Sequence, residues 1–392
     1  MSRVGRRTTA GGRRGRALPA AAAVLTALLL AGCGGDGYEP RGPFRPLPEG
    51  APPRVGPPTT QPAPPPRAPA EPGAEDEEGG DPNVVATDLD VPTGLVVLPD
   101  GSAVVGERET GTLWHVFPDR SPQKELMTVS GIDTTGDGGL LGLALSPSFA
   151  EDGLLYAYVS TATDNRVVRF PLGGTPNPVL TGIPRGETDN GGGLWFAPDG
   201  TMFVGTGDTG RPELAADPRS LAGKVLHVDE FGRAVGRTRV YSSGHRDVAA
   251  LCSTGAEDAT LFAAGDRELN AVTQNSDHGW PEATAGSVGP VVEFPGPDAG
   301  LGGCTVAGTT VFLGSLDGER VHIAALDGFG RVQDTPESVL DGEYGRLRTV
   351  VLDPSGGLWI TTSNRDGAGD PADDDDKVLR IVPPTSQGSS PL

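Results

Sequence analysis

The stretch Gly193-Leu194-Trp195-Phe196-Ala197-Pro198-Asp199-Gly200, which leads into Met202-Phe203-Val204, contains the pattern that decides the fold. A short apolar run ends in Pro-Asp-Gly, and a second apolar run follows almost at once. Pro, Asp and Gly together favour a tight turn, and runs of this length and composition favour strands over helices. The stretch therefore predicts two antiparallel strands joined by a hairpin turn.

The same plan returns along the chain at intervals of roughly 50 residues. Copies begin at Gly94, Gly142 and Gly193, and looser copies begin near Ala249, Gly302 and Leu347. A third apolar run follows several of them, at residues 113–116, 167–170 and 378–381. Radial repetition of small antiparallel sheets produces such spacing. We predict an all-β, six-bladed β-propeller, because a pair of β-sandwiches would not repeat a two-strand motif at this interval.

The N-terminal segment reads as an export signal. Residues 1–32 contain six arginines and no acid, an apolar run covers 17–30, and Leu30-Ala31-Gly32-Cys33 follows. This arrangement is typical of a bacterial lipoprotein signal peptide, and the apolar run is shorter than the roughly 20 residues of a membrane span. We expect Cys33 to carry a lipid, and the exported protein to be anchored to the outer face of the cell membrane through that lipid alone.

Residues 33–82 cannot form a packed core. Positions 34–82 include 15 of the 38 prolines and the acidic run Glu75-Asp76-Glu77-Glu78. Such a composition indicates an extended, disordered linker. We therefore divide the chain into a signal peptide (1–32), a lipidated N-terminus and linker (33–82), a propeller (83–384) and a disordered tail (385–392).

The charge balance and the cysteines limit the partners of the folded part. The formal net charge is −21, and only three lysines occur, at positions 124, 224 and 377. Nucleic-acid binding requires a basic patch and is therefore not expected. Cys252 and Cys304 form an even pair in an oxidising compartment, so we expect a disulfide, with two separate buried thiols as the alternative. We expect the protein to be a monomer and to bind a small molecule.

Several motifs, taken in order, resemble the pyrroloquinoline-quinone-dependent (PQQ-dependent) sugar dehydrogenases, the glucose/sorbosone dehydrogenase family. They are Gly139-Leu140-Leu141-Gly142-Leu143-Ala144-Leu145-Ser146-Pro147, Ser220-Leu221-Ala222-Gly223-Lys224-Val225-Leu226, Gly244-His245-Arg246, Gly279-Trp280-Pro281, Gly345-Arg346-Leu347-Arg348 and Thr361-Thr362-Ser363-Asn364-Arg365-Asp366-Gly367. The resemblance spans about residues 91–382. It implies hydride transfer from the anomeric carbon of an aldose to the quinone, with a histidine as base and calcium polarising the quinone.

The resemblance places Asp189 at the base position, where the family has His-x-Gly-Gly, and Asp208 where a carboxylate orients that base. Three interpretations of Asp189 stay open. Two facing carboxylates cannot both ionise easily, so one could act as a base with a raised pKa. The pair could instead bind a cation through oxygen ligands, or Asp189 could close a turn.

The cofactor-binding positions implied by the resemblance are Arg246, Asp247, Arg346 and Arg348. Arginine suits the carboxylates of PQQ because its guanidinium binds them in a bidentate manner. Asp247 stands where the family has a neutral amide, and Asp317 stands where it has a cation. The resemblance implies PQQ and calcium as cofactors, and because of these acids we expect the quinone to bind more weakly than in a histidine-bearing relative.

Two functions remain open: a PQQ-dependent aldose dehydrogenase, and a redox-inactive propeller of the same family that binds a sugar or a protein. A calcium-dependent, lactonase-like hydrolase is a more distant third. The motifs of serine hydrolases, nucleotide-binding proteins and Cys-x-x-Cys proteins do not occur. We expect His245 and His278 to have structural roles, and Asp373-Asp374-Asp375-Asp376 to form an exposed charged connection.

Overall fold

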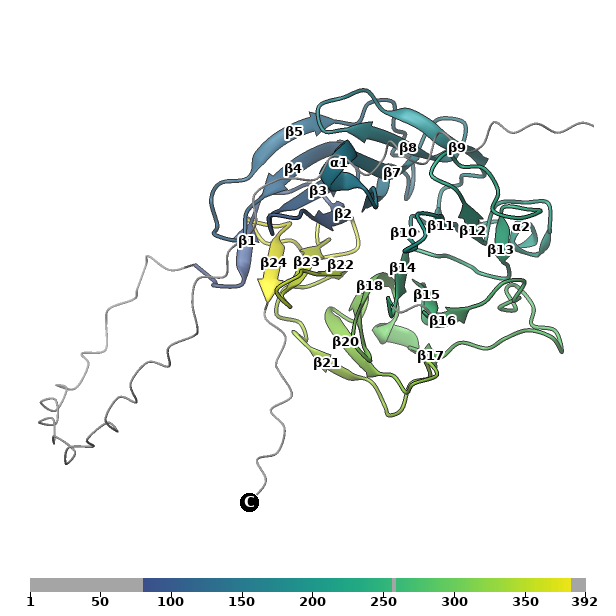
Figure 1. Cartoon of the computed structure of the whole chain (residues 1–392). Coiled ribbons are helices and arrows are strands. Elements are labelled where there is room, and N and C mark those ends of the chain that lie inside the picture. Colours follow the sequence, from purple (N-terminus) through teal and green to yellow (C-terminus); the bar gives the residue numbers. More distant parts are fainter. Residues whose placement is uncertain (1–79, 256–258, 382–392) are drawn as a thin grey trace, which may run out of the picture. The chain divides into compact units, whose positions relative to one another are not determined.

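Six four-stranded antiparallel sheets make up the folded part of the protein. The computed structural model describes residues 80–255 and 259–381. The predicted signal peptide, Cys33, the linker up to residue 79 and the tail lie outside the described residues. The strands run from Val84 to Ile381, and the predicted six-bladed β-propeller is confirmed (Figure 1).

Each sheet is a blade, numbered here in chain order. Blade 1 contains β2 (Pro92–Val97), β3 (Ala103–Glu107), β4 (Thr112–Val116) and β5 (Lys124–Thr128). Blade 2 contains β6 (Leu140–Leu145), β7 (Leu154–Ser160), β8 (Asn165–Pro171) and β9 (Asn177–Ile183). Blade 3 contains β10 (Leu194–Phe196), β11 (Met202–Gly205), β12 (Val225–Val228) and β13 (Val240–Ser242).

The second half of the ring follows the same order. Blade 4 contains β14 (Ala250–Ser253), β15 (Leu261–Gly265), β16 (Glu268–Val272) and β17 (Val292–Glu293). Blade 5 contains β18 (Leu301–Ala307), β19 (Thr310–Ser315), β20 (Arg320–Ala325) and β21 (Glu337–Val339). Blade 6 contains β22 (Leu347–Leu352), β23 (Leu358–Thr362), β24 (Val378–Ile381) and, as its outermost strand, β1 (Val84–Ala86).

The repeated turn after the innermost strand explains why the sequence pattern recurs. In blade 3, Oδ1 of Asp199 accepts hydrogen bonds from the N–H and the hydroxyl of Thr201, at 2.9 and 2.7 Å. Asp100 makes the same two bonds to Ser102 in blade 1, and Asp353 makes them to Ser355 in blade 6. A short polar side chain that bonds its own backbone two residues on stabilises a turn locally.

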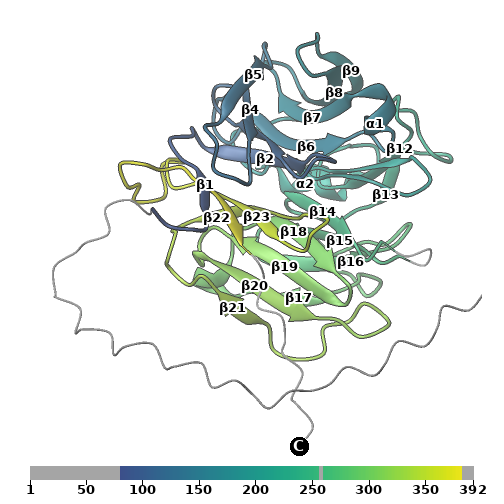
Figure 2. The same ribbon diagram turned by 60° about the vertical axis from the view of Figure 1, so that its left-hand side comes forward.

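Burial is arranged around the ring. Six apolar clusters occur among the described residues, one at each junction between neighbouring blades. The strand β3 is buried along its whole length, whereas β5 at the rim is largely exposed. The outer strands β5, β9 and β21 lie at the periphery, as Figure 2 shows. A sheet that is buried on both faces needs an apolar neighbour on each side. A closed ring gives every blade two such neighbours.

The two ends of the propeller meet in blade 6. The N-terminal β1 pairs with the C-terminal β24, with Val84 opposite Leu379 and Ala86 opposite Val378. Cys252 of β14 and Cys304 of β18 form a disulfide between the innermost strands of blades 4 and 5, with Cα atoms 5.8 Å apart. These links tie together segments that are distant in sequence.

The run from Asp373 to Asp376 differs from the exposed connection expected above. Asp373 and Asp374 are exposed, but Asp375 and Asp376 are buried. The Asp376 carboxylate accepts hydrogen bonds from the Asn364 and Arg365 backbone N–H groups. Those donors lie 10 or more residues away, so the local sequence gives no sign of them. The second half of the run therefore anchors the loop after β23.

The helices are short and few. They are α1 (Phe149–Asp152), α2 (Pro212–Ala216) and a 3-10 turn at Gly296–Asp298. Within the described residues, no helix has the length and apolarity needed to cross a membrane.

Candidate functional site

Charged residues that precede or begin the innermost strands of several blades lie near enough for their charges to act on one another, and Asp189 is one of them. Its φ of 54° is in the left-handed region, and Gly191 and Gly192 follow with φ of 77° and 139°. A side chain at Gly192 would collide with the Leu141 carbonyl, since its Cβ would lie 2.9 Å from that oxygen. The glycines therefore allow the loop before β10 to pass close to blade 2.

Asn190 holds this loop in place through hydrogen bonds of its side chain and backbone. Its side-chain carbonyl accepts hydrogen bonds from the Gly186 N–H and from the Asn165 amide, both at 3.0 Å. Its side-chain amide donates to the Gly186 carbonyl at 3.0 Å, and its backbone carbonyl accepts from the Tyr158 hydroxyl at 2.8 Å. Asn190 is 3% exposed. A buried and fully bonded network of this kind holds a single loop conformation, and so it presents Asp189 at a defined place.

The Asp189 carboxylate faces Arg246, whose Nε lies 3.6 Å from Oδ1. Burial raises the pKa of Asp189, a hydrogen bond from Thr188 and the charge of Arg246 oppose the rise, and the charges of Asp208 and Asp266 add to it. A carboxyl whose pKa lies above its usual range accepts a proton more readily than an ordinary aspartate near neutral pH. Asp189 is thus a candidate general base.

Asp208 does not hydrogen-bond to Asp189 in the part of the chain that the structure describes. Its Oδ2 accepts the Trp280 indole N–H at 2.8 Å, and its Oδ1 accepts the Gly210 backbone N–H at 2.7 Å. Because both oxygens have these other partners, Asp208 acts on Asp189 through its charge. Its own contact holds the Trp280 side chain. The two carboxylates also have separate partners, which argues against a shared cation.

Asp247 lies beside the same glycines, and its Oδ1 accepts the Gly191 backbone N–H at 2.8 Å. Burial, with the nearby charges of Asp189 and Asp137, raises its pKa to about 7, although the bond from Gly191 and the charge of Arg348 act in the opposite direction. A second titratable carboxyl therefore lies next to Asp189.

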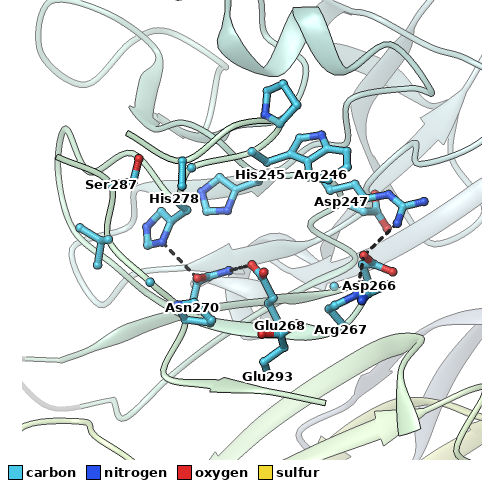
Figure 3. A pocket seen from close by; sticks show the side chains of 18 of the residues that line it. His245, Arg246, Asp247, Asp266, Arg267, Glu268, Asn270, His278, Ser287 and Glu293 are labelled. Atoms are coloured by element: carbon cyan, nitrogen blue, oxygen red, sulfur yellow. Dashed lines mark hydrogen bonds and ion pairs between the residues drawn. The ribbon is translucent and has the colours of Figure 1, made fainter. Parts of the chain in front are cut away.

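Arg246 opens onto a pocket of about 690 Å³ at blade 4, which Figure 3 shows from close by. Its Nη1 donates to Asp266 at 3.0 Å, and its guanidinium lies 5.5 Å from the centre of the Trp280 ring. The other wall carries Glu268 and Glu293. The pocket is thus polar, with one aromatic face and charges of both signs, a composition that suits a polyhydroxylated ligand.

Arg346 is already occupied by two carboxylates. Its Nη1 donates to Asp317 and its Nε to Asp366, both at 3.0 Å. Asp317, which the sequence places at a cationic position of the family, is therefore an ion-pair partner of Arg346. This pairing leaves Arg346 less free to bind an anionic ligand.

Unlike Arg246 and Arg346, Arg348 has no hydrogen bond or ion pair from its side chain to any residue that the structure describes. Burial and the charge of Arg108 lower its pKa to about 10, although Asp366, Asp247 and Asp137 act against that change. Arg108 is 7% exposed; its Nη2 pairs with Glu109 at 2.7 Å, and its Nε is buried without a hydrogen-bond partner in the described residues. Two guanidinium groups that repel each other and have unused donors are suited to an anion between them.

The histidines and the buried lysine serve the fold. Burial lowers the pKa of His245 well below its usual value; its ring bonds the Ser242 hydroxyl at 2.8 Å and stacks on His278 at 4.7 Å. His278 in turn bonds Asn270 at 3.1 Å (Figure 3). Lys224 donates to three backbone carbonyls, those of Leu214, Ala215 and Ala222. None of these three side chains is free to act as a base or to hold a ligand's carboxylate.

The structure adds site residues that the sequence analysis did not select: Arg108, Asp137, Asp266, Glu268, Trp280 and Glu293. Arg108 and Asp266 both sit in charged triplets at strand ends, Glu107-Arg108-Glu109 and Asp266-Arg267-Glu268. Charge directly after a fully buried strand is the signal that could have identified them. Among residues 80–255 and 259–381, no group of three His, Cys, Asp or Glu side chains is arranged to hold a metal ion.

Comparisons with known proteins agree with this geometry. Residues 89–289 match the family model described as glucose / sorbosone dehydrogenase. Among curated proteins, the chain is 23% identical over 343 residues to the aldose sugar dehydrogenase YliI of Escherichia coli, a match that covers 72% of this chain and 90% of that protein. It is 26% identical to quinoprotein glucose dehydrogenase B of Acinetobacter calcoaceticus over 256 residues, which is 52% of this chain and 53% of that protein.

Two solved structures are closer in sequence. A PQQ-bound aldose sugar dehydrogenase from Streptomyces coelicolor is 38% identical, with a TM-score of 0.73, over 76% of this chain and 96% of that one. A putative glucose dehydrogenase from Thermus thermophilus is 34% identical, with a TM-score of 0.69, over 76% of this chain and 98% of that one. The six-bladed ring, the ordered motifs and these matches have one explanation: the chain belongs to the glucose/sorbosone dehydrogenase family.

Proposed function

We propose that the protein is a cell-surface oxidoreductase that removes a hydride from the anomeric carbon of an aldose with the aid of PQQ. The observation that carries the proposal is the pair Arg108 and Arg348, two guanidinium groups with unused donors whose charges act on each other, while Arg348 also acts on Asp247 beside Asp189. A carboxylate-bearing oxidant requires a pair of cations, and a sugar hydroxyl that loses its proton requires a base nearby. The 38% identical relative was solved with PQQ bound, which supports the same cofactor here.

The donor set fits PQQ at Arg348 and Arg108, where the Nε of Arg108 is buried without a partner in the described residues. Arg246 and Arg346 would contribute less, because Asp266 pairs with the first while Asp317 and Asp366 pair with the second. We therefore expect the quinone to bind, and more weakly than it would to four free arginines. When bound, PQQ would accept the hydride, two electrons with a proton, that leaves the sugar carbon, and calcium is proposed with it by family resemblance.

The chain's own residues would handle the proton. The anomeric hydroxyl loses its proton to the Asp189 carboxylate as the C1–H bond breaks, and the sugar becomes a lactone. Arg246, 3.6 Å away, keeps Asp189 charged before the transfer and orients its Oδ1. The Trp280 face and the acidic wall of the blade 4 pocket would hold the remaining hydroxyl groups of the sugar.

The decisive experiment is a reconstitution of the purified exported protein with PQQ and calcium, followed by absorbance and by dye-linked oxidation of aldoses. Asp189→Asn should keep quinone binding and lose about 10²- to 10⁴-fold in turnover, the usual contribution of a general base. Arg348→Gln should instead weaken quinone binding by about 10-fold or more, because it removes charge-assisted hydrogen bonds.

Matched controls are available on the rim. Asp334→Asn and Arg237→Gln change exposed residues whose side chains make no hydrogen bond or ion pair with the described part of the chain, and both should behave as wild type. A wild-type protein that binds no quinone would refute the cofactor assignment. An Asp189→Asn variant with full turnover would refute the role of Asp189 as base.

A further inference from the structure

One carboxyl oxygen of Asp247 accepts a hydrogen bond from a described residue, and the other does not. Its Oδ1 accepts the Gly191 backbone N–H, and no described residue hydrogen-bonds to its Oδ2. The loop around it is tightly packed: a Cβ on Gly207 would lie 2.5 Å from Oδ1 and 1.8 Å from the Asp189 carbonyl oxygen. The loop around the carboxyl is therefore fixed, and Asp247 lines the pocket at blade 4.

The charges around Asp247 come from several blades. Asp189 from the loop before β10 and Asp137 from the loop before β6 both disfavour a negative charge there. Arg348 of β22 favours it, but Arg348 is shared with Asp366 and Asp137 and is itself repelled by Arg108. Two acids therefore act against one shared cation, and the neutral form of the carboxyl is correspondingly favoured.

We propose that Asp247 works as a neutral carboxylic acid whose Oδ2–H donates a hydrogen bond to the ligand bound at the channel end, while Asp189 remains the ionised member of the pair. The contacts of the two residues explain why Asp247 is the neutral member and Asp189 the ionised one. Asp189 has Arg246 at 3.6 Å, whereas Asp247 has a backbone N–H on one oxygen and no ion pair to any described residue. One proton held on Asp247 relieves the repulsion between the two carboxyls.

This inference rests on the proposed function for the identity of the ligand, and its first test does not need that ligand. Aspartate labelled with ¹³C at the carboxyl group is introduced, and the resonance that disappears in Asp247→Asn is assigned to Asp247. Its titration should have a midpoint near 7, in line with the direction and size of the shift given above. A midpoint near the ordinary value of 3.8 would overturn the proposal.

The second test uses PQQ with calcium as the probe and measures its dissociation constant from pH 5 to pH 9. Wild type should lose affinity about 10-fold per pH unit above 7, as the donor is lost and a negative charge appears. Asp247→Asn keeps an acceptor for Gly191 and a permanent donor, so it should bind with a flat profile. Asp334→Asn should keep the wild-type profile.

The outcomes separate the two proposals. A wild-type profile identical to that of Asp247→Asn would overturn the donor role of Asp247, even if the enzyme is active. A protein that binds no PQQ at any pH would overturn the proposed function, whereas a carboxyl midpoint near 7 in that protein would still support a proton on Asp247.

Discussion

Replacing Asp247 with Asn should stabilise the folded protein above pH 7 and leave its stability unchanged near pH 4. The pKa of Asp247 is about 7 in the folded state, against an ordinary value of 3.8. Between these values the folded state binds a proton that the unfolded state does not, so the wild type loses stability as pH rises. Asparagine cannot ionise and does not pay this penalty.

The size of the effect follows from the shift. About three pKa units at 1.36 kcal/mol each set an upper bound of about 4 kcal/mol for the gain in unfolding free energy above pH 7. The Asp247 side chain is partly exposed in the pocket at blade 4, so we expect about half of that. The hydrogen bond from the Gly191 N–H is retained, because the asparagine carbonyl can accept it.

Urea unfolding of wild type, Asp247→Asn and the control Asp334→Asn at pH 4, 6, 7 and 8 measures the effect. The difference in unfolding free energy between Asp247→Asn and wild type should be near zero at pH 4 and grow through pH 7. A difference that does not vary with pH would refute the electrostatic account of Asp247.

Three further predictions concern other parts of the chain. Replacing Cys252 and Cys304 together with serine removes a bond that spans 52 residues, which should cost up to about 4 kcal/mol of unfolding free energy; an unchanged urea midpoint would contradict this. Asn190→Ala leaves buried groups of the Asp189 loop without partners and should destabilise the protein by roughly 2 kcal/mol or more, with faster amide exchange at Gly186; exchange as slow as in wild type would count against it. Cys33→Ala should release the protein from the membrane fraction, and a signal-cleaved variant that stays bound would disprove the lipid anchor.

The propeller could be read from the sequence because its determinants are local. The hydrogen bonds that Asp199 accepts from Thr201 and Asp353 accepts from Ser355 join residues two apart, so each turn is visible as a short motif. The interval between motifs then gives the number of blades. The register of β1 on β24 joins opposite ends of the folded part, and no local pattern in the sequence signals it.

The candidate site was only partly predictable, because most of its contacts join residues that are distant in sequence. Asp189 is visible because three glycines follow it, but its partner Arg246 comes from another blade. Arg108 and Arg348 are 240 positions apart, and their charges act on each other only when the ring closes. Burial of Asp376 depends on donors from Asn364 and Arg365, which four consecutive acids do not suggest. The charge interactions between residues of different blades arise only once the blades have assembled.

The most direct test of the central claim is single-turnover oxidation of an aldose by the PQQ- and calcium-loaded protein, compared between wild type and Asp189→Asn at equal quinone occupancy. The account predicts that the quinone is reduced in wild type when sugar is added, and that the rate falls at least about 100-fold in Asp189→Asn, as expected for loss of a general base. Loaded wild-type protein that leaves the quinone oxidised with every aldose, or an Asp189→Asn variant as fast as wild type, would contradict it.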